Sequence, residues 1–347
     1  MILSDHLEQW AVHAAGGAPR REIAQTVLAL AEAAATLAER ISLGPLRAGF
    51  AEVVGSNPDG DHQAALDVEA DELFRSALRR APVAVVGSEE HEGADAQSDT
   101  APLVVVIDPL DGSSNIETNV SLGTIFGILP MTGLGPNAVV LQAGRRLLAA
   151  GMVVYGPQTT LALTLGEGTA LFHLDPRERA FIRTNAQLKI LEGRPEYAIN
   201  SSNYRHWDGA IRAYIDDCIA GVSGPRGRNF NTRWLASLVA ETWRILNRGG
   251  VFLYPADRRP GYERGRLRLV YEANPIAMLI EEAGGAATDG TRRIRDLKPQ
   301  ELHERTPLVF GAADKVERIA RYYASPPSTS ERSPLFGQRG LFYNARG

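Results

Sequence analysis

The chain has 347 residues, of which 44% are hydrophobic and 22% charged, and its formal net charge is -4. This composition is typical of a globular protein with one large or two medium domains. The small net charge gives no reason to expect nucleic acid or a membrane surface as a partner. The single cysteine, Cys218, excludes an internal disulfide and a cysteine zinc site. No N-terminal basic segment precedes an apolar run, as in a targeting signal, and no apolar run is long enough to span a membrane. We therefore expect a cytoplasmic protein.

The first half of the chain is predicted to start with helices and to continue with strands. Apolar residues at helical spacing predict helices over 19–41 and 67–77. Short apolar runs rich in Val and Ile predict a series of strands. These strands are expected at 83–87, 104–107, 122–129, 137–143 and 151–155, with a hairpin around 161–172.

The second half of the chain mixes the two kinds of element. This block begins near residues 197–200. Strands are expected at 251–254 and 267–271, and helices at 207–219, 234–247 and 275–284. A segment rich in proline and serine, 325–330, ends the folded part. We therefore divide the chain into an N-terminal half, a C-terminal half and a tail, which cover residues 1–195, 196–324 and 325–347.

Two carboxylates, Asp108 and Asp111, stand where an apolar strand ends, and Gly112, Ser113 and Ser114 follow. Strand ends are where open α/β sheets present their chemistry. The two carboxylates can share hard cations, and the following amides can turn toward a phosphate. Such turns are also common surface chemistry, so the signal depends on the whole run. Taken together, the run indicates phosphoryl transfer.

Glu89 and Glu90 follow the preceding strand in the same way. Neighbouring side chains on a regular strand point in opposite directions, so one would bind metal while the other reaches the attacking water. A solvated acidic loop is the alternative interpretation of this pair. Asp67, at the start of a predicted helix, has the pattern of a helix N-cap.

The run Ile107–Asn115 resembles the metal-binding signature of the lithium-sensitive, magnesium-dependent sugar and inositol phosphatases. The continuation Ser121–Ile128 is similar to that of class I fructose-1,6-bisphosphatases, and motifs match over roughly residues 20–320. The resemblance implies an α/β fold, a layered αβαβα sandwich with two sheets between helices. It also implies hydrolysis of the 1-phosphate of fructose 1,6-bisphosphate to fructose 6-phosphate.

The resemblance implies roles for the acidic residues as well. Asp67 and Glu90 would act as the catalytic pair that activates the attacking water. Metal would be held by oxygen atoms of Asp61, Glu89, Asp108, Leu110 (its backbone carbonyl), Asp111 and Glu272. Oxygen ligands suit Mg²⁺, with Mn²⁺ able to substitute, and argue against zinc. Two or three ions are expected. The seven histidines have no ligand spacing and are interpreted as ordinary residues.

Substrate contacts are implied in the same way. They comprise Asp111, Gly112, Ser113, Ser114, Asn200, Arg233, Trp234, Tyr254 and Arg266. Relatives have tyrosine where this chain has Trp234, whose indole donates a hydrogen bond but cannot accept one. They have lysine where this chain has Arg266, and either cation binds phosphate. Because Arg233 would reach the distal phosphate across a subunit interface, we expect a homo-oligomer, and the family implies a tetramer.

The chain departs from its relatives at their regulatory sites. AMP-inhibited relatives carry a Lys-Tyr pair and an arginine where this chain has Pro102-Leu103 and Leu129-Pro130. We therefore expect no inhibition by AMP, although Arg20 and Arg21 near the first helix are additional cations. One cysteine cannot supply the redox loop of plastid relatives.

Three other functions remain open. Sedoheptulose-1,7-bisphosphatase activity, alone or as a second activity, fits the same carboxylates. An inositol-phosphate phosphatase is disfavoured, because Arg233, Tyr254 and Arg266 suggest two phosphates on one substrate. A non-catalytic sugar-phosphate sensor would keep the fold, but the presence of every metal carboxylate argues against it. Gluconeogenesis and carbon fixation are both open as uses of the product.

Overall fold

The structure is a computed structural model that describes residues 1–12, 19–46, 53–56 and 62–325. Asp61, an expected metal ligand, lies outside the described residues, as does the tail from residue 326 onward. Among the helices that are described, none has both the length and the apolar character needed to cross a bilayer.

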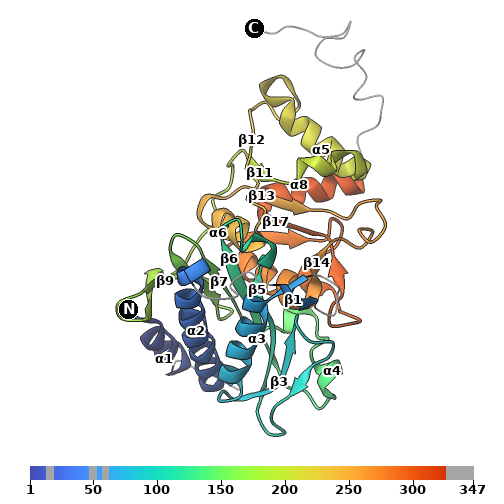
Figure 1. Cartoon of the computed structure of the whole chain (residues 1–347). Helices are drawn as coiled ribbons and strands as arrows, with labels where there is room; N and C mark the ends of the chain where they lie inside the picture. Colours follow the sequence, from blue (N-terminus) through green and yellow to red (C-terminus); the bar gives the residue numbers. More distant parts are fainter. Residues whose placement is uncertain (13–18, 47–52, 57–61, 326–347) are drawn as a thin grey trace, which may run out of the picture.

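An eight-stranded sheet forms the centre of the N-terminal half (Figure 1). Its strand order is β10-β9-β8-β7-β6-β5-β3-β4, and β3 and β5 are its parallel pair. The strands are β3 (Val83–Ser88), β4 (Asp95–Ala96), β5 (Leu103–Asp111), β6 (Leu122–Pro130), β7 (Ala149–Tyr155), β8 (Thr159–Thr164), β9 (Thr169–Asp175) and β10 (Ala180–Asn185).

A five-stranded sheet with the order β12-β11-β13-β17-β15 forms the centre of the C-terminal half. Its strands are β11 (Glu196–Ala198), β12 (Asn231–Thr232), β13 (Val251–Tyr254), β15 (Gly285–Thr288) and β17 (Leu308–Ala312). Two small ribbons complete the strands, and they consist of β1 (Val53–Ser56) with β2 (His62–Ala64) and β14 (Leu267–Arg268) with β16 (Arg305–Thr306).

Helices form three layers around the two sheets. The outer face of the large sheet is covered by α1 (Leu3–Val12), α2 (Arg20–Leu43) and α3 (Ala65–Leu78). Between the sheets lie α6 (Leu238–Arg248) and α7 (Asn274–Glu282). The far face of the small sheet is covered by α5 (Gly209–Ile219) and α8 (Ala313–Ala324). This is the expected αβαβα sandwich, and the fold prediction is confirmed.

Strand β5 shows how the sequence produces the layers. Val104 and Val106 pack toward α6 and α7, whereas Val105 and Ile107 pack toward α2 and α3. Because both faces of the strand are covered, every residue from Leu103 to Ile107 is buried. Each buried Val or Ile side chain stabilises the fold by about 1.5–3 kcal/mol relative to exposure. The polar residues at the end of this strand are therefore held by a rigid core.

Three local predictions are wrong. The strand expected at 137–143 is instead a short helix, α4 (Pro136–Val139), because Pro136 follows an extended glycine and favours the first position of a helix. Of the strand expected at 267–271, two residues pair, and a helical turn follows. Asp67 is not an N-cap: α3 is capped at Ala64, and Asp67 accepts a hydrogen bond from the Ala64 N–H at 2.7 Å.

Candidate metal and substrate site

Asp108 and Asp111 reach the same side of the sheet because β5 is irregular between them. On a regular strand, residues three positions apart point to opposite faces. Here the register advances three residues on β5 and two on β6, so β5 contains a bulge. The Thr124 hydroxyl donates to the Pro109 carbonyl at 2.9 Å, and the Leu110 N–H donates to Asp108 Oδ1 at 3.0 Å. These bonds fix the backbone that aims the two carboxylates.

Glu272 comes from a π-helical turn, Leu269–Ala273, directly before α7. Turns of this kind are frequent at functional sites because they re-aim a side chain within a helix. The Glu272 carboxylate accepts a hydrogen bond from the Arg268 N–H. Burial and the charge of Asp111, partly offset by Arg268, raise the pKa of Glu272 to about 7.

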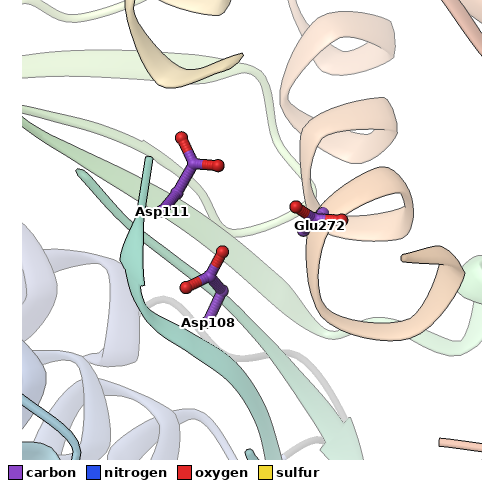
Figure 2. A group of neighbouring side chains, drawn as sticks. All are labelled: Asp108, Asp111 and Glu272. Atoms are coloured by element: carbon purple, nitrogen blue, oxygen red, sulfur yellow. The ribbon is translucent and has the colours of Figure 1, made fainter. Parts of the chain in front are cut away.

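Asp108, Asp111 and Glu272 face one another where the two halves of the chain meet (Figure 2). One carboxylate oxygen of each lies within 4.8 Å of the others, and the residues are 1%, 8% and 7% exposed. Burial raises the pKa of Asp111 to about 7 and that of Asp108 well above its ordinary value. Buried carboxylates so close together are costly unless a cation offsets their charge. The geometry is therefore that of a site for divalent cations with oxygen ligands.

Glu89 joins this cluster from the end of β3. Its N–H donates to the Ile107 carbonyl at 3.1 Å, which extends the pairing of β3 with β5. The half-buried Glu89 side chain shares a hydrogen bond with Asp108. Burial, and then the charge of Glu272, raise the pKa of Glu89 to about 8. The structure thus brings together four of the expected ligand carboxylates, Glu89, Asp108, Asp111 and Glu272.

Glu90 interacts with Asp67 on α3. Burial, together with the charge of Glu90, raises the pKa of Asp67 to about 7, although hydrogen bonds from Ala64 and Ser113 oppose this shift. Asp67 is 2% exposed, and its Oδ1 atom is buried without a hydrogen-bond partner. Because buried acceptors without a partner are rare, this oxygen is available to accept a hydrogen bond from a bound molecule.

The loop after β5 turns sharply toward the C-terminal half. Gly112 has a φ of 84°, in the left-handed region that favours glycine, and Ser113 and Ser114 begin a 3₁₀ turn. Ser114 is exposed, whereas Ser113 is half-buried near Asp67. This places the expected phosphate loop directly beside the acidic cluster.

Two hydrogen bonds connect the end of β5 and the loop after it to the C-terminal half. Asp111 Oδ2 accepts from the Val239 N–H at 3.3 Å, in the first turn of α6. Asn115 Nδ2 donates to the Ala236 carbonyl at 2.9 Å. Ala236 has a φ of 55°, which is unfavourable for a residue with a Cβ, so these contacts hold a strained loop in place. Hydrogen bonds therefore join the segment 111–115 to the loop that carries Arg233 and Trp234.

Trp234, Tyr254 and Asn200 gather near the ends of β11, β12 and β13. The Trp234 ring stacks on Phe252 with centroids 5.9 Å apart and an interplanar angle of 9°, and its centroid lies 6.2 Å from that of Tyr254. Asn200 and Tyr254 line the same small pocket. Asn200 Oδ1 accepts from the Ser202 N–H at 3.2 Å, so its Nδ2 group is the end available to donate to an anion.

Arg266 supplies positive charge beside this pocket. Its guanidinium lies 4.9 Å from the centroid of the Tyr262 ring, and that of Arg259 lies 4.0 Å from the same ring. Burial raises the pKa of Tyr254, whereas the nearby Arg266 charge lowers it. An anion near Tyr254 would therefore meet a cation and a hydroxyl together.

Arg233 differs from the other expected substrate residues because its side chain is exposed. Its N–H donates to the Tyr197 carbonyl at 2.8 Å, and its guanidinium donates to the Thr232 carbonyl at 3.3 Å. The structure does not bring it into the pocket lined by Asn200 and Tyr254. This exposure agrees with a side chain that would serve another subunit.

Family models match both halves of the chain. The model described as "Fructose-1-6-bisphosphatase, N-terminal domain" matches residues 11–186, and that described as "Fructose-1-6-bisphosphatase, C-terminal domain" matches residues 190–324. The chain belongs to the fructose-1,6-bisphosphatase family. The family prediction made from the motifs is confirmed.

Relatives in the fructose-1,6-bisphosphatase family match nearly end to end. "Fructose-1,6-bisphosphatase class 1" of Rhizobium meliloti (strain 1021) is 54% identical over 326 residues, which cover 93% of each chain. The protein of the same name from Methylorubrum populi is 52% identical over 340 residues, or 98% of this chain and 97% of that one. The crystal structure of Leishmania major fructose-1,6-bisphosphatase in holo form has a TM-score of 0.86 and 32% identity, and covers 93% of this chain and 99% of that chain.

The positions for which the sequence analysis expects no AMP site are held here by apolar pairing. Leu103 is fully buried and pairs with Pro130 across β5 and β6. Arg20, which could have compensated, pairs with Glu167 at 2.7 Å and lies 4.6 Å from the centroid of the Trp10 ring. Leu103, the first residue of β5, and Arg20, the first residue of α2, thus both have partners within the fold.

The structure also reveals polar residues that the sequence motifs did not single out. His91 and His303 belong to a hydrogen-bond network beside the acidic cluster, together with Asp71 and Ser88. Asp71 lies four residues after Asp67, so the helical spacing of the two acids was a usable signal. The histidines gave no signal, because their partners are distant in sequence.

Proposed function

We propose that this chain uses Mg²⁺ to hydrolyse the 1-phosphate of fructose 1,6-bisphosphate, releasing fructose 6-phosphate and inorganic phosphate. The observation that carries the proposal is the meeting of Asp108, Asp111 and Glu272 at the junction of the two halves. Relatives named fructose-1,6-bisphosphatase class 1, about half identical over most of the chain, support the choice of substrate.

The donor set fits divalent cations of the magnesium type. Glu89, Asp108, Asp111 and Glu272 offer carboxylate oxygens, and the Leu110 carbonyl is the expected backbone ligand. Burial, and then the neighbouring carboxylates, raise the pKa values of Glu89, Asp111 and Glu272, and bound cations would offset the cost of ionising them together. Mg²⁺ bound there would neutralise the phosphoryl group and stabilise the leaving oxygen. Two or three ions are proposed, with Mn²⁺ as a substitute.

Asp67 and Glu90 are proposed to take the proton of the attacking water. A general base works best when its pKa lies near the working pH, and burial raises the pKa of Asp67 to about 7. The unpaired Oδ1 atom of Asp67 would accept a hydrogen bond from that water. Glu90, next to Asp67, would hold the second acceptor position and orient the nucleophile.

The remaining residues are proposed to hold the sugar and its distal phosphate. Asn200, Tyr254 and Arg266 would bind the 6-phosphate as two neutral donors and a cation. Trp234 would pack against the sugar beside Tyr254. Gly112, Ser113 and Ser114 would hold the 1-phosphate with main-chain and hydroxyl donors, next to Asp111.

A homo-oligomer is proposed because the exposed Arg233 would complete the distal phosphate site of a neighbouring subunit. The family resemblance favours a tetramer, and a cytoplasmic location is proposed with it. Sedimentation of the intact protein would test the assembly: a monomer at assay concentrations, with full activity, would contradict the role given to Arg233.

Release of phosphate from fructose 1,6-bisphosphate, with Mg²⁺ and then with excess EDTA, tests the function. We expect turnover in Mg²⁺ and none in EDTA. Sedoheptulose 1,7-bisphosphate, assayed in parallel, tests the alternative bisphosphatase activity. Binding of fructose 1,6-bisphosphate without phosphate release at saturating Mg²⁺ would contradict the proposal and favour a non-catalytic sensor.

A further inference from the structure

A polar network lies beside the acidic cluster and connects α3 to the turn after β3. Asp71, one helical turn after Asp67, is 5% exposed. Its Oδ1 atom accepts a hydrogen bond from the Ser88 hydroxyl at 2.7 Å, and its Oδ2 atom lies 2.6 Å from His91 Nε2. One carboxylate therefore holds both residues that flank Glu89 and Glu90.

Ser88 transmits this contact to the backbone of the turn. Its hydroxyl oxygen accepts from the Glu90 N–H at 3.3 Å while its hydrogen is donated to Asp71. Ser88 is the donor in its bond with Asp71, because a carboxylate oxygen accepts hydrogen bonds. Asp67 and Asp71 are four residues apart and lie on the same face of α3. The Asp71–Ser88 bond therefore fixes how far Glu90 lies from the helix that carries Asp67.

The network continues into the C-terminal half. His303 Nε2 lies 3.0 Å from the His91 carbonyl, and His303 Nδ1 lies 2.8 Å from the Tyr271 hydroxyl. A carbonyl only accepts, so Nε2 of His303 carries the proton and, in the neutral ring, Nδ1 accepts from Tyr271. Tyr271 directly precedes Glu272 in the π-helical turn. Hydrogen bonds thus connect α3, the Glu89–Glu90 turn and the backbone beside Glu272.

We propose that Asp71, acting through Ser88 and His91, is a positioning residue that sets Glu89 and Glu90 against Asp67 and Glu272. This inference rests on the proposed function, because it gives the network a purpose in metal binding and water activation. The described contacts of Asp71 are with Ser88, His91 and Arg75, none of which is an expected substrate-binding residue. Partners that orient a metal site from outside typically change affinity or activity about 10–100-fold when they are removed.

Arg75 and Asp95 offer a matched control within the same cluster. Arg75 lies 2.7 Å from Asp95 and 3.8 Å from Asp71, so both acids share one arginine. The Asp95 carboxylate, however, accepts from Arg75, which in turn contacts His91 Nε2, so this side chain reaches the Glu89–Glu90 turn from the His91 side and not through Ser88. Asp95→Asn removes an ion pair of α3 while leaving the Asp71–Ser88–Glu90 connection intact.

The test compares Asp71→Asn, Ser88→Ala and Asp95→Asn in the full chain. The readouts are Mn²⁺ binding measured by electron paramagnetic resonance without substrate, kcat and KM for fructose 1,6-bisphosphate, and the melting temperature. We expect Asp71→Asn and Ser88→Ala to weaken Mn²⁺ binding and to lower kcat at least about tenfold, with KM within about twofold of wild type. Asp95→Asn should match wild type in both binding and kcat.

His91 provides a rescue test. His91→Gln keeps a side-chain N–H donor for Asp71, whereas His91→Ala removes it. We expect the glutamine variant to retain more Mn²⁺ affinity and kcat than the alanine variant.

Wild-type Mn²⁺ affinity and kcat in both Asp71→Asn and Ser88→Ala would overturn the inference. So would a lower melting temperature with unchanged kcat per folded molecule, since that result shows a structural role alone. If the wild-type protein releases no phosphate, the proposed function fails, while the Mn²⁺ affinities of the same variants still decide whether Asp71 positions the metal ligands.

Discussion

The two sides of the site are built by opposite means. On the side proposed to bind metal and activate water, Asp67, Asp108 and Asp111 are 2%, 1% and 8% exposed and lie at the ends of core elements. On the side proposed to bind the sugar phosphate, Arg233 is exposed and Asn200 is half-buried in a loop. Glu272 is the exception, because it belongs to the C-terminal half yet faces the metal side.

This difference separates two kinds of free-energy contribution. Buried carboxylates are costly to bring together, and a bound cation recovers that cost only in one arrangement. Exposed cations and aromatic rings cost little and bind an anion in the ground state and the transition state alike. Changes on the metal side should therefore lower kcat, and changes on the substrate side should raise KM.

The largest effect is expected from removal of a metal carboxylate. Glu89→Ala or Asp111→Ala should lower phosphatase activity by about a thousandfold or more, because each removes charge from the cation site. Circular dichroism should show a folded chain, since both residues lie at strand ends. The control is Glu69→Gln, which alters the ion pair between Glu69 on α3 and Arg40 on α2 and should keep wild-type activity. Mg²⁺-dependent turnover near wild type in either alanine variant would contradict the site assignment.

A large effect on the other parameter is expected at Arg233. Arg233→Ala should raise KM for fructose 1,6-bisphosphate far more than it lowers kcat. A lost charged contact of about 2–3 kcal/mol corresponds to a rise of roughly 30–150-fold. Steady-state kinetics at saturating Mg²⁺ measure the split, with the exposed Arg177→Ala as the control. An unchanged KM would show that Arg233 serves neither its own subunit nor a neighbour.

A moderate effect is expected on the stability of the metal-free protein. Burial raises the pKa of Glu89 to about 8 and that of Asp111 to about 7, well above unfolded values. The folded chain therefore holds protons that the unfolded chain has released, and this stabilisation is lost as pH rises from about 5 to 8. In EDTA, Asp111→Asn should raise the melting temperature at pH 8 and have less effect at pH 5.

Scanning calorimetry at the two pH values measures this difference. Added Mg²⁺ should stabilise the wild-type protein more at pH 8 than at pH 5, because cations replace protons in the cluster. Equal stabilisation at both pH values, together with no gain in the Asp111→Asn variant, would mean that the carboxylates do not share one cation site.

The smallest effect is expected from AMP, which should leave activity unchanged. Pro102 and Leu103 offer no side-chain donor, and Arg20 is engaged by Glu167. A nucleotide phosphate would give up its hydration for little return there. Activity is titrated with AMP at fixed Mg²⁺, in the wild type and in Arg21→Ala. Cooperative inhibition that disappears in the variant would show that Arg21 has rebuilt the regulatory site.

The sequence was most informative where local pattern and chemistry coincide. The apolar run 104–107 predicted the strand whose end carries Asp108, and the motif around it predicted the family, which the comparisons confirm. The roles assigned to individual site residues stay predictions. The division at residue 195 also stays a prediction, and Asp61 lies outside the described residues.

Long-range geometry could not be predicted from the pattern. Spacing alone would place Asp108 and Asp111 on opposite faces of β5, and only pairing with β6 reveals the bulge that reunites them. The apolar residues before Glu272 predict a strand, whereas the structure has a π-helical turn there, directly before α7. His303 reaches His91 across 212 positions in sequence, a contact that no local signal indicates.

The most direct test of the proposed reaction is to follow fructose 1,6-bisphosphate by phosphorus NMR in the presence of the wild-type protein. With Mg²⁺, the 1-phosphate resonance should disappear while those of fructose 6-phosphate and inorganic phosphate grow in equal amounts. With EDTA, the spectrum should stay unchanged. Loss of the 6-phosphate instead, or turnover that persists in EDTA, would contradict a site in which the buried carboxylates bind the reacting end of the substrate.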